Sequence, residues 1–192
     1  MLVTQLPATA RGKFAAHLLA LGAEDRRLRF GCAMADAAVE KYVQNLDFRR
    51  DALFGVYGIN LDLAGACHVA QAGDLAEFGV SVSTGERRRG IGSALVARAA
   101  LHARNAGIGA LFMHCLSENR SMMRIAHQLG MRVITECGES DGQLVLPARD
   151  FQSVFDEMAQ QGLALYDYSS KAGIAAARLL FREAMIGPAR IT

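Results

Sequence analysis

The chain has 192 residues, of which 52% are hydrophobic and 21% are charged, and its net charge is +2. This length suits one domain with a sizeable core, and the composition argues against disorder. So small a net charge gives no reason to expect nucleic-acid binding.

The four cysteines and five histidines are scattered, without the spacings of a zinc site or a disulfide framework. We therefore expect no metal site, and thiols that stay reduced. The start of the chain lacks a signal-peptide pattern, and no apolar run approaches the ~18 residues of a membrane helix. These features predict a cytoplasmic protein that does not enter a membrane.

Residues 1–83 alternate between helical and strand patterns. A short strand is expected at 3–6, and apolar spacing predicts helices at 9–22 and 34–46. Strand-like runs follow at 52–59 and 63–71, joined by a turn at 60–62 that indicates an antiparallel hairpin. Period-two alternation predicts a third strand at 75–83, with Phe78 and Glu77 on opposite faces.

The remaining chain predicts a helix at 91–107, a buried strand at 110–116 and a helix at 119–130. Arg98, His102 and Asn105 form a polar stripe that we assign to the outer side of the first of these helices. Two strands, at 131–137 and 142–148, are expected around a polar turn at 138–142.

From Asp150 onward the pattern is helical again, in two stretches. Phe151, Val154, Phe155 and Met158 form an apolar stripe, which suits either a cap on a substrate cleft or a homodimer contact. The sequence thus predicts one mixed α/β (α+β) domain at 1–148, with a helical C-terminal extension at 149–192 packed on it.

The segment "RRRGIG" at 87–92 lies between a predicted strand and a predicted helix, where unpaired N–H groups and the helix dipole favour an anion. Gly90 and Gly92 would let the backbone approach a ligand. A Walker loop is excluded, because Ile91 and Gly92 stand where Lys and Ser/Thr are required. A Rossmann fingerprint is excluded because Leu95 replaces its third glycine.

The same segment resembles the [QR]-x-x-G-x-[GA] loop of the GNAT N-acyltransferases. "LSENRSMMRIAHQLGM" resembles that superfamily's second signature, and the element order from about residue 53 to 147 is similar. "RRLRFG" and "AEFGVSVS" further resemble the acetyltransferase domain of Pat-type bacterial protein lysine acetyltransferases. The resemblance implies the GNAT fold and acetyl-CoA as the cofactor.

In that superfamily the pantetheine arm pairs with the strand before the loop, and the pyrophosphate lies on the loop itself. The resemblance therefore implies a cofactor site made of Val80, Ser81, Val82, Arg87, Arg88, Arg89, Gly90, Ile91, Gly92, Ser93 and Asn119. Asn119 suits a helix N-cap equally well. The arginines could instead form a solvated turn, although three cations beside a helix N-terminus favour a bound polyanion.

Attack on a thioester needs a neutral amine, so a base should lie beside the cofactor. Glu77 is our candidate for this catalytic role; partial screening from water would raise its pKa. The alternative is a solvated carboxylate. The strand N–H near Val80 could stabilise the oxyanion.

A general acid is harder to assign, because Ala126 occupies the position where many GNAT proteins carry a tyrosine. We expect His127 to lie on the surface, and His114 and Cys115 to be buried filler rather than reactive groups.

Together these features predict an acetyl-CoA-dependent N-acetyltransferase. It would act on a primary amine, either of a small molecule or of a protein lysine, by direct attack in a ternary complex. The alternative is a CoA-binding sensor or regulatory protein of the same fold without catalysis.

Overall fold

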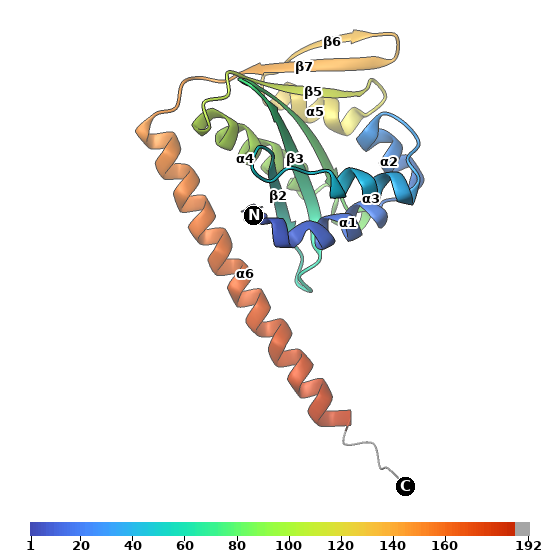
Figure 1. The fold of residues 1–192 in the computed structure, drawn as a ribbon, viewed down its shortest axis with the longest axis vertical. Coiled ribbons are helices and arrows are strands. Elements are labelled where there is room, and N and C mark those ends of the chain that lie inside the picture. Colours follow the sequence, from blue (N-terminus) through green and yellow to red (C-terminus); the bar gives the residue numbers. More distant parts are fainter. Residues whose placement is uncertain (187–192) are drawn as a thin grey trace.

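The computed structural model describes the backbone of residues 1–186 and the side chains of residues 1–178. Within this range one mixed sheet has the strand order β1-β2-β3-β4-β5-β7-β6 (Figure 1). Every neighbouring pair is antiparallel except β4 and β5, which are parallel. The strands are β1 Thr4–Gln5, β2 Ala52–Tyr57, β3 Leu63–Ala72, β4 Leu75–Val82, β5 Ala110–Leu116, β6 Arg132–Glu136 and β7 Glu139–Val145.

The helices cover both faces of this sheet. The N-terminal helices are α1 Arg11–Leu19, α2 Ala23–Phe30 and α3 Asp36–Gln44, and the later ones are α4 Ile91–Asn105, α5 Arg120–Gln128 and α6 Phe151–Ile186. The expected fold class and most expected elements are confirmed. Helix α2 was not predicted, because it has only 8 residues and buries none of them, which leaves no apolar stripe to detect.

The core lies on both faces of the sheet, as strand alternation requires. Phe54 of β2 points to the α4 side, where it joins Leu95 and Leu111. Its neighbour Leu53 points to the opposite side and joins Phe14 and the other apolar residues of α1 and α3. The α1–α3 group and the α4–α5 pair are therefore held on opposite faces of one sheet.

The turn between β6 and β7 is shorter than expected. We placed it at residues 138–142, but β7 already begins at Glu139. Cys137 and Gly138 make the turn, with φ values of 49° and 88°, which is the pattern of a two-residue hairpin. The polar residues of "ESDG" belong to a strand, in which Glu139 and Asp141 face solvent while Ser140 is fully buried.

The C-terminal segment is one continuous helix of 36 residues rather than two stretches. Its first half packs against α4, and the helix then runs on past the domain (Figure 1). The stripe that we assigned to the outer side of α4 is therefore covered: Arg98 is only 3% exposed and pairs with Glu157 of α6. The predicted extension also included residues 187–192, which lie outside the described residues.

No helix in the described part of the chain is both long enough and apolar enough to span a bilayer.

Candidate active site

The parallel strands β4 and β5 separate partway along their length. Their pairing covers Leu75, Ala76 and Glu77 of β4, opposite Ala110–Phe112 of β5. Beyond Glu77, β4 remains paired with β3 as far as Val82. In the described structure the other edge of residues 78–82 therefore faces a gap between β4 and β5, into which an extended ligand could pair like an added strand.

Strand alternation identifies the groups that line this gap. Ser83 donates its N–H to the Ala64 carbonyl of β3 (2.9 Å), so the backbone groups of Ser81 and Gly79 also point toward β3. Those of Val80 and Val82 then point into the gap. Of the three strand residues predicted to hold the cofactor, Ser81 is turned away, and its hydroxyl contacts Nε2 of the buried His17 (2.9 Å).

The predicted phosphate loop lies where β4 ends and α4 begins. Gly90 is the N-cap residue of α4 with φ of +78°, and an added Cβ would meet nothing within 4 Å. The first main-chain bond of the helix runs from Ala94 to Gly90, which leaves the N–H groups of residues 91–93 without helical acceptors. Ile91 is 3% exposed and packs into the core, so it can offer a ligand only its N–H.

Gly92 serves helix packing as well as access to the backbone. An added Cβ would lie 3.0 Å from Cδ1 of Ile125, so this position sets the close approach of α4 to α5. The Ser93 hydroxyl lies 3.3 Å from the Gln128 side chain, also across this pair of helices.

The positive charges of the loop arginines are better compensated by carboxylates than the sequence indicated. Arg87 forms an ion pair with Asp25 of α2 (2.5 Å), and Arg89 forms one with Glu86. Arg88 is exposed, with φ of 60°, and forms no ion pair with any described residue. Two of the three cations thus have carboxylate partners in the free protein, which weakens the inference from charge alone and leaves the backbone N–H groups as the main feature of the loop.

Asn119 lies at the far side of the gap and is the N-cap of α5. Its Oδ1 accepts from the Met122 N–H (3.1 Å), and its Nδ2 donates to the Leu28 carbonyl of α2 (3.2 Å). The N-cap role is therefore confirmed. Arg27 of α2 also pairs with Glu118 (2.5 Å). Helix α2 thus contacts the loops that follow both β4 and β5, and it bridges the two sides of the gap.

Glu77 and Arg29 lie on the same face of β4. Glu77 is exposed, so the partial screening that we expected is not found. The space beside Gly79 is filled by the guanidinium of Arg29, which a Cβ there would approach to 2.2 Å. Arg29 has no carboxylate partner among the described residues. The signal that could have revealed it is the cationic "RRLRFG" segment, which we used only for its family resemblance.

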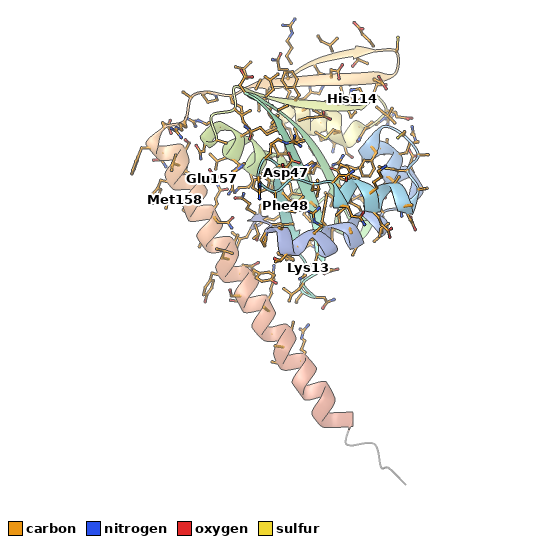
Figure 2. All side chains as sticks on the ribbon, viewed as in Figure 1. Lys13, Asp47, Phe48, His114, Glu157 and Met158 are labelled. Carbon is orange, nitrogen blue, oxygen red and sulfur yellow. The ribbon has the colours of Figure 1, made fainter. Side chains whose placement is uncertain are left out.

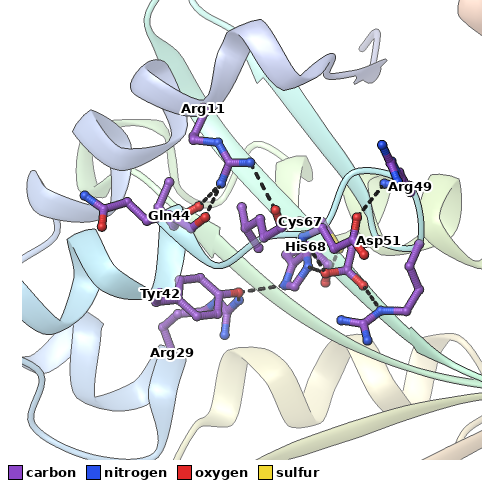
Figure 3. Close-up of polar contacts among 12 residues, drawn as sticks. Arg11, Arg29, Tyr42, Gln44, Arg49, Asp51, Cys67 and His68 are labelled. Carbon is purple, nitrogen blue, oxygen red and sulfur yellow. Dashed lines mark hydrogen bonds and ion pairs between the residues drawn. The ribbon is translucent and has the colours of Figure 1, made fainter.

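A chain of partly buried polar groups runs from Arg29 through the buried His68 to Asp51 (Figure 3). Arg29 donates to the Tyr42 hydroxyl (3.1 Å), which lies 2.7 Å from Nδ1 of His68. Nε2 of His68 lies 3.4 Å from Asp51. Burial, together with the charge of Arg29, lowers the pKa of His68, which favours the neutral imidazole. This network orders Arg29 beside the strand.

His114 on β5 is not buried filler, contrary to our expectation. Its side chain is 44% exposed, and its Nδ1 lies 2.7 Å from Asp141 of β7. The hydrogen bond to Asp141 raises the pKa of His114, and the charges of Asp141, Glu139 and Glu77 act in the same direction. The prediction failed because Leu111, Met113 and Cys115 dominate the strand, whereas His114 lies on its open face.

The neighbouring residues lie where we expected them. Cys115 is 3% exposed and burial raises its pKa, which disfavours a thiolate. Ala126 is fully buried in the α4–α5 core, so no side chain from that position reaches the gap. His127 is exposed, as predicted. No group of three or more metal-binding side chains occurs within the described residues.

Comparisons with known proteins agree with this geometry. No curated protein matches the chain. Among solved structures, the GNAT domain of S. lividans PAT is similar with a TM-score of 0.64 at 19% identity, over 75% of this chain and 89% of that one. Salmonella typhimurium yncA, a putative acetyltransferase solved with acetyl-CoA, has a TM-score of 0.57 at 16% identity, over 78% and 96%.

A ribosomal-protein-alanine N-acetyltransferase from Brucella melitensis has a TM-score of 0.58 at 13% identity, over 76% of this chain and 100% of that one. At these identities the likeness concerns the fold, and it confirms the resemblance to the Pat-type domain at that level. The profile of the Acetyltransferase (GNAT) family matches residues 16–131, which is more than half of the sequence. The chain therefore belongs to the GNAT acetyltransferase family.

Proposed function

We propose that the protein is a cytoplasmic N-acetyltransferase that moves an acetyl group from acetyl-CoA to a primary amine by direct attack in a ternary complex. The observation that carries this proposal is the gap between β4 and β5, with the N-terminus of α4 at its end. A family that transfers acetyl groups supports the reaction class.

The residues around the gap suit acetyl-CoA in two respects. Val80 presents a free N–H and carbonyl along the strand, and Val82 presents a free N–H, because the Val82 carbonyl accepts from Nε of Arg87 (3.4 Å). These free groups would pair with the amides of the pantetheine arm. The unpaired N–H groups after Gly90 would receive the pyrophosphate, with Arg87–Arg89 and the Ser93 hydroxyl nearby. Asn119 could contact the arm only by sharing or exchanging its bond to Leu28.

Glu77 would act as the base. It lies at the last paired position of β4, where the gap begins, and its exposed carboxylate can receive the ammonium proton directly or through water. The N–H of Val80 points into the gap, where it would stabilise the oxyanion. As the amine nitrogen bonds to the acetyl carbon, the C–S bond would break and CoA would leave as the thiolate, which takes up the second proton that the nitrogen loses.

The acceptor would approach over the open face of β5 and β7. Glu77, Asp141 and Glu139 line this face, and negative charge attracts an ammonium group before it loses its proton. Either a small amine or a protein lysine meets this requirement, and both remain candidate acceptors.

Calorimetry and kinetics with Glu77→Gln test the proposal. We expect acetyl-CoA to bind the wild-type protein and the variant with similar affinity. We also expect kcat for acetylation of the best acceptor in a panel of amines and lysine peptides to fall about 100- to 10,000-fold in the variant, the range typical of a lost general base. Glu40→Gln on the exposed face of α3 is the matched control and should retain wild-type kcat.

The possible results lead to distinct conclusions. Absence of acetyl-CoA binding at high micromolar concentration would overturn the proposal. Binding with no acceptor-dependent release of CoA would instead favour the sensor alternative, to which the lack of a side-chain acid at Ala126 also points.

A further inference from the structure

Helix α6 presents large apolar side chains to solvent. Phe151 is 86% exposed, Met158 69% and Tyr166 76%, and Phe155 and Leu165 are at least half exposed. A soluble monomer rarely leaves a continuous apolar surface of this size uncovered.

Rotation of α6 about its own axis cannot bury the exposed side chains against the domain of the same chain. Glu157 accepts hydrogen bonds from Arg98 (2.8 Å), His102 and Asn105. Farther along, Lys171 donates to the Tyr57 carbonyl (3.0 Å). These contacts fix one side of the helix, and Figure 2 shows Glu157 toward the domain and Met158 directed away from it.

A line through Phe151, Phe155, Met158 and Leu165, flanked by Tyr166, has the spacing of a two-helix seam. Its positions alternate steps of four and three residues, which is the repeat that keeps one line of side chains facing a partner helix. The charged residues of α6 up to residue 178 all lie outside this line. The seam consists of Phe151, Phe155, Met158, Gly162, Leu165, Ser169, Ala172 and Ala176.

The order of large and small side chains along the seam is complementary to the same order read in the opposite direction. In an antiparallel pair with its two-fold axis between residues 163 and 164, each layer joins one large and one small side chain. These layers are Phe151 with Ala176, Phe155 with Ala172, Met158 with Ser169, and Leu165 with Gly162. A parallel pair would instead oppose Phe with Phe and Ala with Ala, and the two axes could not keep one distance.

Gly162 supports this arrangement. A glycine inside a helix is destabilising relative to alanine. In the described structure an added Cβ at Gly162 would meet nothing within 4 Å, so the chain's own packing does not require glycine there. In the antiparallel pair, Leu165 of the second copy would occupy the space beside Gly162, which explains the glycine.

We propose that α6 pairs antiparallel with α6 of a second copy of this chain, forming a homodimer through this seam. From the exposed fractions, the four large side chains of the seam together with the flanking Tyr166 offer on the order of 600 Å² per helix. The resulting total of about 1,200 Å² lies at the lower end of specific interfaces.

A membrane surface is a poorer occupant of this face. A helix that binds anionic lipid needs a polar face rich in cations. Up to residue 178, however, α6 has two cations, Lys171 and Arg178, against three acids, Asp156, Glu157 and Asp167.

Sedimentation equilibrium tests the association. We expect twice the mass of one chain for the wild type at micromolar concentration. Met158→Glu places a charge in the seam and should weaken association at least 100-fold, with helix content and acetyl-CoA binding retained. Gln160→Glu on the opposite, exposed side of α6 is the matched control and should remain dimeric. A wild-type chain that stays monomeric at 100 μM, or that binds anionic vesicles through this face, would overturn the proposal.

Disulfide trapping tests the direction, on proteins in which the exposed Cys32 and Cys137 are replaced by serine. Phe155→Cys and Ala172→Cys chains should cross-link when co-expressed, because the two positions share a layer. Neither variant should cross-link alone, since the two copies of the same cysteine in the dimer would lie about 25 Å apart along the helices. Cross-linking of Phe155→Cys with itself would show a parallel pair and contradict the antiparallel seam.

Discussion

At the scale of single residues, contacts from distant segments decided the environment of the candidate site. Glu77 was identified from alternation in one strand, and the structure does place it on the open face. Arg29 beside Gly79 and His114 beside Asp141 were not foreseen as parts of the site, because both contacts join residues at least 27 positions apart. The "RRLRFG" segment marks Arg29 as cationic, but neither segment of such a pair shows which residue it will contact.

The pairing of His114 with Asp141 predicts a measurable titration. The imidazole should titrate above the ordinary pKa of about 6.5, because the charged form is stabilised by the carboxylate. Asp141→Asn removes that charge and should lower the pKa of His114. NMR titration of the ring resonances measures both values.

Asp74→Asn, on the turn between β3 and β4, is the control for loss of one surface carboxylate and should leave the His114 titration unchanged. A titration near 6.5 in both the wild type and Asp141→Asn would show that the pair does not form in solution.

At the scale of elements, α6 covers the polar stripe of α4 that we had predicted to lie at the surface. This contact gives the stripe a structural role. Burial alone would raise the pKa of Glu157, but hydrogen bonds from His102, Asn105 and Arg98 hold it at about 2. A carboxyl whose pKa is lowered by folding stabilises the protein above its ordinary pKa of about 4.5. This contribution is lost as the pH falls from about 4.5 to about 2.

Glu157→Gln should therefore lower the free energy of unfolding at pH 7 by about 3 kcal/mol, since it leaves the buried Arg98 without a counter-charge. The loss should shrink toward pH 2, where Glu157 itself becomes protonated. Urea unfolding at several pH values measures this dependence. Asp156→Asn, the neighbouring acid, which faces away from Arg98, should change stability by less than about 0.5 kcal/mol; equal losses in both variants would contradict the role of Glu157.

At the scale of the whole molecule, the gap between β4 and β5 should couple ligand binding to stability. Acetyl-CoA at 100 times its Kd should add about 2.7 kcal/mol to the free energy of unfolding. For a chain of this length that corresponds to a rise in Tm of roughly 5–10 °C. Differential scanning calorimetry with and without acetyl-CoA measures the rise.

Two glycines provide a matched pair for this experiment. Gly90 has φ of +78° and Gly73 has φ of +65°, and an added Cβ would meet nothing within 4 Å at either position. Alanine should therefore strain both by about 1 kcal/mol. Only Gly90→Ala places a methyl group at the start of α4, so only this variant should lose the Tm rise with acetyl-CoA. A full rise in Gly90→Ala would place the phosphate site elsewhere.

The sequence by itself determined the fold class, the order of nearly all elements and the position of the glycine-containing loop before α4. These follow from local properties: hydrophobic period, turn residues, and glycines before a helix. The tertiary structure decided where α2 bridges the two loops, that Asp25 neutralises Arg87, and that α6 is one helix anchored at Arg98. Each of these depends on contacts between segments distant in the chain, whose free energy is set by folding as a whole and not by the residues of one segment.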